Sequence, residues 1–86
     1  MSVVVRYWAA AKQAAGRAEE RVDGATTLAE VLDAVRARHA PRPALARVLE
    51  RCAYLVDGAP VGTRPPTGVP VGPASVVEVL PPFAGG

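Results

Sequence analysis

The residues with the clearest capacity for chemistry lie at the end of the sequence, which reads VVEVLPPFAGG. Gly86 supplies a terminal carboxylate, and neither Gly85 nor Gly86 has a Cβ, so this backbone can enter a channel too narrow for other residues. An activated acyl group tends to racemise at its α-carbon, and glycine has no stereocentre to lose. We therefore expect Gly86 to be the reacting residue, as a carboxylate that is activated and passed on.

The residues before the diglycine are suited to holding it away from a folded body. Pro81 and Pro82 fix their φ angles and cannot donate backbone hydrogen bonds, so they disfavour a further strand. Residues 81–86 can reach up to roughly 20 Å, and Phe83 offers an aromatic anchor for a partner's pocket. The alternative is a frayed terminus without a function, which is common at chain ends. We expect the following residues to contact a partner: Leu80, Pro81, Pro82, Phe83, Ala84 and Gly85.

Side-chain chemistry is sparse elsewhere in the sequence. A nucleophile pair of His39 and Cys52, the single histidine and cysteine, remains an alternative. The apolar setting of Cys52 favours a buried structural thiol, and the helix dipole accounts for His39 as a surface residue at a helix end. Four zinc ligands cannot be found, so no metal site is predicted. Carboxylates are expected on caps, turns and solvated faces: Glu19, Glu20, Asp23, Glu30, Asp33, Glu50, Asp57 and Glu78.

The strongest local pattern predicts an amphipathic helix in TTLAEVLDAVRARH. Thr27 and Glu30 have the spacing of a capping box, and Pro41 prevents continuation of the helix. Apolar residues recur at i, i+3, i+4 and i+7, which places them on one helix face that packs on a sheet. These residues are Leu28, Val31, Leu32 and Val35.

The other elements follow from alternation and turn residues. The strand at 3–8 is apolar on nearly both faces, so we expect it inside a sheet, whereas 17–24 is predicted as a polar edge strand. Residues 59–73 are rich in proline, which favours a loop and removes the N–H donors of a phosphate cradle, with a short strand near Val69. The remaining predictions are an Ala-rich turn or helix at 9–16, a short helix at 43–52, and strands at 53–58 and 75–80.

This order predicts the α+β fold class, with a mixed four- to five-stranded sheet and one main helix packed on one face. The opposite face would stay open for a partner. With 86 residues, we expect one domain at 1–80 and a flexible tail at 81–86. The net charge is +2, but the basic residues are scattered singly, so no nucleic-acid platform is expected. One cysteine allows no internal disulfide, and neither a membrane span nor a signal segment is evident, so a cytoplasmic protein is expected.

Taken together, the segments VVVRYWAAAKQAAG, TTLAEVLDAV, RCAYLVDG and LPPFAGG resemble the MoaD/ThiS family of ubiquitin-like sulfur carriers. The long opening segment is most similar to the MoaD branch, the small subunits of molybdopterin synthase. The resemblance implies the β-grasp fold. This sequence departs from the family pattern at Phe83, where many relatives have valine, and at Asp57, where many have asparagine.

The resemblance also implies a mechanism centred on Gly86. A MoeB-like adenylating enzyme would use ATP to activate its carboxylate, and a sulfurtransferase would supply the sulfur of a thiocarboxylate. The tail would then enter a MoaE-like large subunit and donate sulfur to cyclic pyranopterin monophosphate in molybdenum cofactor biosynthesis. No bound cofactor is expected, and catalytic side chains would come from the partners.

Three alternatives remain open at this point. The same carboxylate chemistry can serve cysteine, thiamin or tRNA thiolation. A ubiquitin-like modifier would instead join Gly86 to lysines of target proteins. A plain interaction module would bind through its tail and open sheet face without any activation.

Overall fold

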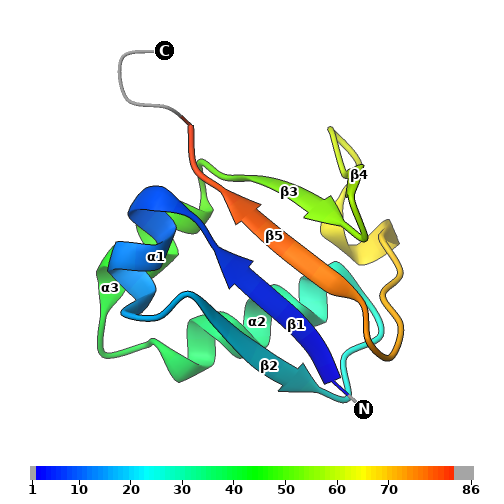
Figure 1. The fold of residues 1–86 in the computed structure, drawn as a ribbon, viewed down its shortest axis with the longest axis horizontal. Coiled ribbons are helices and arrows are strands. Elements are labelled where there is room, and N and C mark those ends of the chain that lie inside the picture. The colour runs from blue at the N-terminus through cyan, green and yellow to red at the C-terminus, as the bar shows by residue number, and fades with distance from the viewer. Residues whose placement is uncertain (1, 83–86) are drawn as a thin grey trace.

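The structure is a computed structural model that describes residues 2–82. The expected tail residues Phe83, Ala84, Gly85 and Gly86 lie outside the described residues. The chain forms, in order, β1 (Ser2–Tyr7), α1 (Ala9–Ala15), β2 (Glu19–Asp23), α2 (Leu28–Arg38), α3 (Pro43–Leu49), β3 (Ala53–Val56), β4 (Ala59–Pro60), a 3-10 turn (Pro66–Gly68) and β5 (Val76–Leu80) (Figure 1).

A mixed five-stranded sheet forms one layer, with the strand order β2-β1-β5-β3-β4. β1 and β5 pair in parallel in the interior of the sheet, and all other neighbours are antiparallel. The predicted places of the first strand inside the sheet and of β2 at its edge are confirmed. Asp57 and Gly58 have φ angles of 50° and 83°, as a tight β3–β4 hairpin requires.

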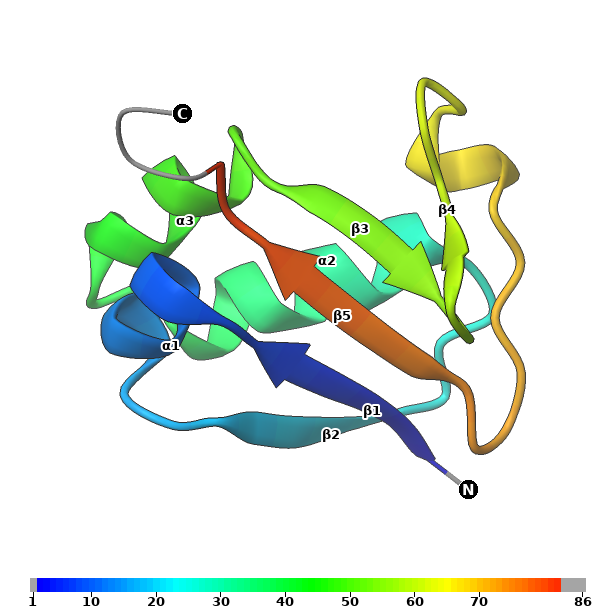
Figure 2. The ribbon, with the colours of Figure 1, turned by 45° about the horizontal axis from the view of Figure 1, so that its top comes forward.

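The second layer is helical, and α2 crosses the back of the sheet in both views (Figures 1 and 2). Leu28, Val31, Leu32 and Val35 of α2 are buried, as the helix pattern predicts. They form one core with the inward-facing side chains of β1 and β5, which are Val3, Val5, Tyr7, Val77 and Val79. α1 and α3 pack together at one end of this layer and add Ala11, Ala15, Leu45 and Leu49 to the core.

The start of α2 is capped as predicted, with one difference. The Thr27 hydroxyl accepts a hydrogen bond from the Glu30 N–H at 3.2 Å. The Glu30 carboxylate reaches back to the N–H and hydroxyl of Thr26, at 2.7 and 2.8 Å, rather than to Thr27. Both side chains therefore satisfy backbone donors that the helix itself leaves free.

Replacing Thr27 with alanine is expected to lower the free energy of unfolding by about 1 kcal/mol, because an N–H of the first helical turn then loses its acceptor. Urea unfolding of Thr27→Ala measures this change. Thr63→Ala, in the exposed part of the proline-rich loop, is the matched control and should stay within about 0.5 kcal/mol of the parent protein. An equal effect of both substitutions would contradict the capping role.

The proline-rich segment 59–73 differs from its prediction in detail. The strand predicted near Val69 is wrong among the described residues. The segment instead contains β4 (Ala59–Pro60), which the loop prediction missed, the 3-10 turn and a single β-bridge between Thr27 and Pro70. Prolines 65, 66, 70 and 73 remove the N–H donors that a longer ladder would need. The segment is instead fastened to the start of α2, because Leu28 donates to Val69 O and Val71 donates to Thr26 O.

Candidate functional site

The root of the predicted tail lies at the end of an interior strand. Leu80 is the last residue of β5 and pairs with Ala53 of β3, whereas β1 pairs along the other side of β5. Leu80 and Pro81 are half-buried and Pro82 is exposed. The sheet therefore holds the strand that leads into the tail from both sides, and the chain leaves this support at the prolines.

Trp8 lies beside this root and was not among the predicted site residues. Its backbone N–H donates to the carbonyl of Val79 at 3.2 Å, directly before Leu80. Its side chain is 48% exposed, which is exceptional for a large hydrophobic residue within the described chain. A partner that approached the end of β5 would meet this indole.

The sheet face opposite α2 is partly apolar. The register of β1, β5 and β3 places Val4, Val76, Leu55 and Leu80 on this face, and all four are half-buried. Arg6 of β1 and Glu78 of β5 are neighbours in the strand register and lie on the same face, among these apolar residues. Apart from the charged Arg6 and Glu78, these four residues form an apolar strip along the face, and Leu80 lies where β5 leads into the tail.

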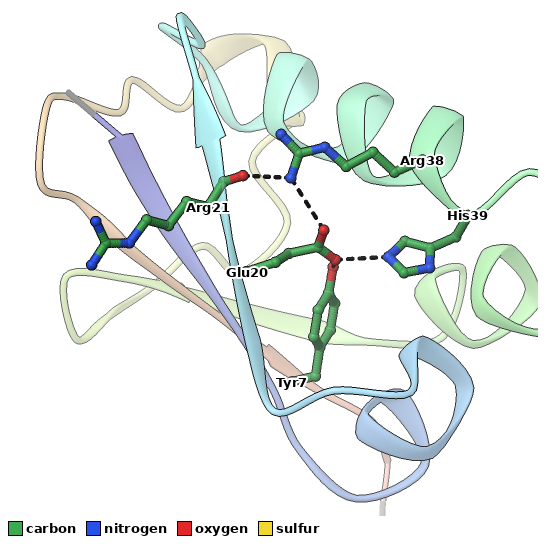
Figure 3. Close-up of polar contacts among 5 residues, drawn as sticks. All are labelled: Tyr7, Glu20, Arg21, Arg38 and His39. Atoms are coloured by element: carbon green, nitrogen blue, oxygen red, sulfur yellow. Dashed lines mark hydrogen bonds and ion pairs between the residues drawn. The ribbon is translucent and has the colours of Figure 1, made fainter.

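Glu20 overturns one sequence-based expectation, because its carboxylate is buried rather than on a solvated face. Its side chain is 4% exposed. Tyr7 Oη donates to Oε2 at 2.5 Å, Arg38 Nη1 donates to Oε1 at 3.1 Å, and His39 Nε2 lies 2.7 Å from Oε2 (Figure 3). The His39 side chain is only 11% exposed, so its predicted surface position is also wrong. The cluster joins β1, β2 and the end of α2.

The surroundings of Glu20 decide the ionisation of this cluster. Burial works to raise the pKa of Glu20, but the hydrogen bonds from Tyr7, His39 and Arg38 outweigh it and hold the pKa below its ordinary value. Burial, followed by the hydrogen bond to Glu20, raises the pKa of Tyr7. At neutral pH the cluster therefore contains a carboxylate that accepts from a neutral phenol and a guanidinium.

This cluster predicts that acid destabilises the protein. Because the pKa of Glu20 is lower in the folded than in the unfolded chain, its ionised form stabilises the fold above about pH 4.5, and this contribution is lost as the pH falls further. The free energy of unfolding, measured in urea from about pH 6 to about pH 3, should depend less on pH in Glu20→Gln. Some dependence should remain, since hydrogen bonds from Thr26 also lower the pKa of Glu30.

Glu19→Gln is the control for this experiment. Glu19 precedes Glu20 on β2, but its side chain is 53% exposed. Its replacement should leave the pH dependence close to that of the parent protein. Equal slopes for Glu20→Gln and the parent protein would contradict the assignment.

The structure gives the alternative nucleophile pair no support. The Cys52 thiol donates to the Val48 carbonyl at 3.1 Å, whereas His39 is bonded to Glu20. Burial raises the pKa of Cys52 to about 11, so the thiol is protonated at neutral pH. Within residues 2–82, no group of three or more His, Cys, Asp or Glu side chains could hold a metal ion. No helix in this range is long and apolar enough to cross a membrane.

Comparison with known proteins identifies the family. The model of the ThiS family matches residues 5–86, from β1 through the diglycine. The chain belongs to the ThiS family. No curated protein matches it. The family resemblance inferred from the sequence is confirmed, and the match includes every residue predicted for the tail site.

Solved structures place this ThiS-family chain in the ubiquitin-like β-grasp fold. SAMP1 from Haloferax volcanii is 25% identical, with all of both chains covered and a TM-score of 0.80. A putative molybdopterin converting factor subunit 1 from Pyrococcus furiosus is 22% identical over 96% of this chain and 99% of its own, with a TM-score of 0.74. A chain from the Helicobacter pylori complex of molybdopterin-converting factor subunits 1 and 2 is 24% identical, with both chains fully covered and a TM-score of 0.68. The predicted fold class is confirmed.

Proposed function

We propose that this protein carries sulfur on the carboxylate of Gly86 for the synthesis of molybdopterin. The observation that carries the proposal is the family match, which continues through Gly85 and Gly86. The end of β5 supports it, because Leu80 pairs with Ala53 of β3 and Pro81 and Pro82 direct the chain out of the sheet.

The proposed chemistry has two steps at the Gly86 carboxyl group. A carboxylate oxygen of Gly86 attacks the α-phosphorus of ATP on a MoeB-like enzyme, and pyrophosphate leaves. A sulfide equivalent from a sulfurtransferase then attacks the carbonyl carbon, forming a C–S bond as the C–O bond to AMP breaks. The resulting thiocarboxylate is ionised at neutral pH and is a good sulfur nucleophile.

The proposed acceptor is cyclic pyranopterin monophosphate, bound by a MoaE-like large subunit. The Helicobacter pylori relative is named as part of a complex of subunits 1 and 2, which supports a partner of this kind. Trp8 and the apolar strip of Val4, Leu55, Val76 and Leu80 offer the folded body's contacts beside the tail. Two deliveries would supply the two sulfur atoms of a dithiolene.

Mass spectrometry of the C-terminal peptide tests the proposal. The protein is incubated with ATP, an adenylating enzyme and a sulfur source, and the expected product has sulfur in place of one oxygen at Gly86. Fragment ions must localise the change to Gly86, since oxidation of Met1, Trp8 or Cys52 alters the mass of the intact protein almost equally. If Gly86 stays unmodified although the adenylating enzyme and the sulfur source are shown to be active, the proposed carrier function is overturned.

A second candidate is a ubiquitin-like modifier, favoured by the likeness to small archaeal modifier protein 1 of Haloferax volcanii at 25% identity. In that case Gly86 forms isopeptide bonds with lysines of target proteins. High-mass conjugates that disappear when Gly86 is deleted would support this candidate. Conversion of the pyranopterin by the thiocarboxylated protein and a MoaE-like subunit, without conjugates, would support the first.

A further inference from the structure

Three arginines from two separate segments of the chain border one hollow beside the Glu20 cluster. The hollow has a volume of about 270 Å³. Arg17 follows α1, Arg38 ends α2, and Arg42 precedes α3. His39 and Gly16 complete the polar part of its wall. The fold therefore gathers basic groups that are scattered singly in the sequence.

The positive charge of this hollow is only partly balanced by a neighbouring carboxylate. Glu20 pairs with Arg38 and His39, but it is buried and does not line the hollow. Within residues 2–82, neither Arg17 nor Arg42 takes part in an ion pair. Arg38 uses Nη1 for Glu20 and for the carbonyl of Arg21. The wall thus presents an excess of positive charge with guanidinium donors to spare.

Backbone geometry brings one of these arginines close to the end of α1. Gly16 has a φ of 76°, and a Cβ at this position would lie 2.7 Å from Arg42 Nη1. The Arg42 N–H donates to the His39 carbonyl at 2.8 Å, in the turn that joins α2 to α3. The missing side chain of Gly16 therefore leaves room for the Arg42 guanidinium at the wall of the hollow.

We propose that this hollow binds a phosphate group, either the free ion or that of a small phosphomonoester. Guanidinium groups suit phosphate oxygens because they donate paired hydrogen bonds in a planar fork. No carboxylate lines the hollow, so none would repel a dianion there. The volume of the hollow suits a small ligand better than the flat surface of another protein. The site is separate from the chemistry proposed for Gly86 and does not depend on it.

Amide NMR with inorganic phosphate as the probe tests this site. Phosphate, added at constant ionic strength against chloride, should shift the signals of Gly16, Arg17 and Arg42 saturably. Arg42→Gln and Arg17→Gln should each weaken the apparent affinity about 10-fold, through loss of a charged donor. Arg51→Gln removes the same charge at an exposed position outside the hollow and should not weaken binding.

The same titration with other ligands distinguishes which ligand the hollow binds. Glycerol 3-phosphate that binds at least as tightly as phosphate indicates a phosphomonoester, and weaker binding indicates the free ion. Equal shifts from chloride, or an equal loss of affinity in Arg51→Gln, would show general charge screening and overturn the proposal. If succinate binds as tightly as phosphate, the phosphate proposal is overturned. The hollow would then be a site for carboxylates, such as those of an acidic protein segment. Unchanged signals outside the hollow verify that each variant is folded.

Discussion

Replacement of Gly86 with alanine is expected to leave the fold unchanged and to reduce thiocarboxylate formation by about 100-fold or more. The added methyl group would obstruct a channel that admits only glycine, and a displacement of about 1 Å at a reacting carbon costs on that order. The change removes no contact among residues 2–82. Urea unfolding measures the fold, and single-turnover mass spectrometry measures the rate of conversion at the C-terminus.

Gly68→Ala is the matched control, because it makes the same chemical change at a glycine with space for a side chain. The nearest heavy atom to a Cβ at Gly68 would be Pro65 Cγ, at 3.9 Å. This variant should be converted at the parental rate. If Gly86→Ala is also converted at that rate, the diglycine is not required by the activating enzyme, and the main support for the carrier proposal is lost.

Replacement of Glu20 with alanine is expected to lower the free energy of unfolding by about 2–3 kcal/mol at neutral pH. The substitution leaves the Tyr7 hydroxyl, His39 and Arg38 without their shared acceptor in a largely buried place. Arg38 is 44% exposed and keeps part of its hydration, so the loss stays below that of a fully buried pair. Urea unfolding, fitted with one m-value for all variants, measures this change in the free energy of unfolding.

Glu19→Ala separates this effect from the loss of any carboxylate on β2. The Glu19 carboxylate lies 3.7 Å from Arg6 Nε, and both side chains are about half exposed. Its removal should cost no more than about 0.5–1 kcal/mol. Comparable losses for the two variants would mean that the Glu20 cluster contributes little beyond an ordinary surface pair.

Local patterns in the sequence were sufficient for most of the fold. The apolar spacing from Leu28 to Val35 predicted the buried face of α2, because a helix repeats its orientation at these intervals. Apolar residues on nearly both faces of 3–8 predicted that β1 lies inside the sheet, because a strand buried on both sides needs no polar face. Gly16 ended α1 as expected, with its left-handed φ.

Interactions between distant segments could not be predicted in this way. The hollow of Arg17, Arg38 and Arg42 exists only because the end of α1 meets the connection between α2 and α3 in space. A signal for Glu20 was present, since it lies two residues before the buried Val22 on β2 and shares its inward face. Because Glu20 is charged, it was predicted to lie on a solvent-exposed face. Only the fold shows the hydrogen-bond partners that offset the cost of its burial.

The parallel pairing of β1 with β5 has a consequence for the time at which the protein becomes competent. Val4 pairs with Val76 and Val5 with Val77, so the interior of the sheet joins segments separated by nearly the whole sequence. Such high contact order delays folding, and a nascent chain on the ribosome cannot close this sheet before β5 has been synthesised. A partner that binds across both strands would therefore recognise the root of the tail only after the whole domain has folded.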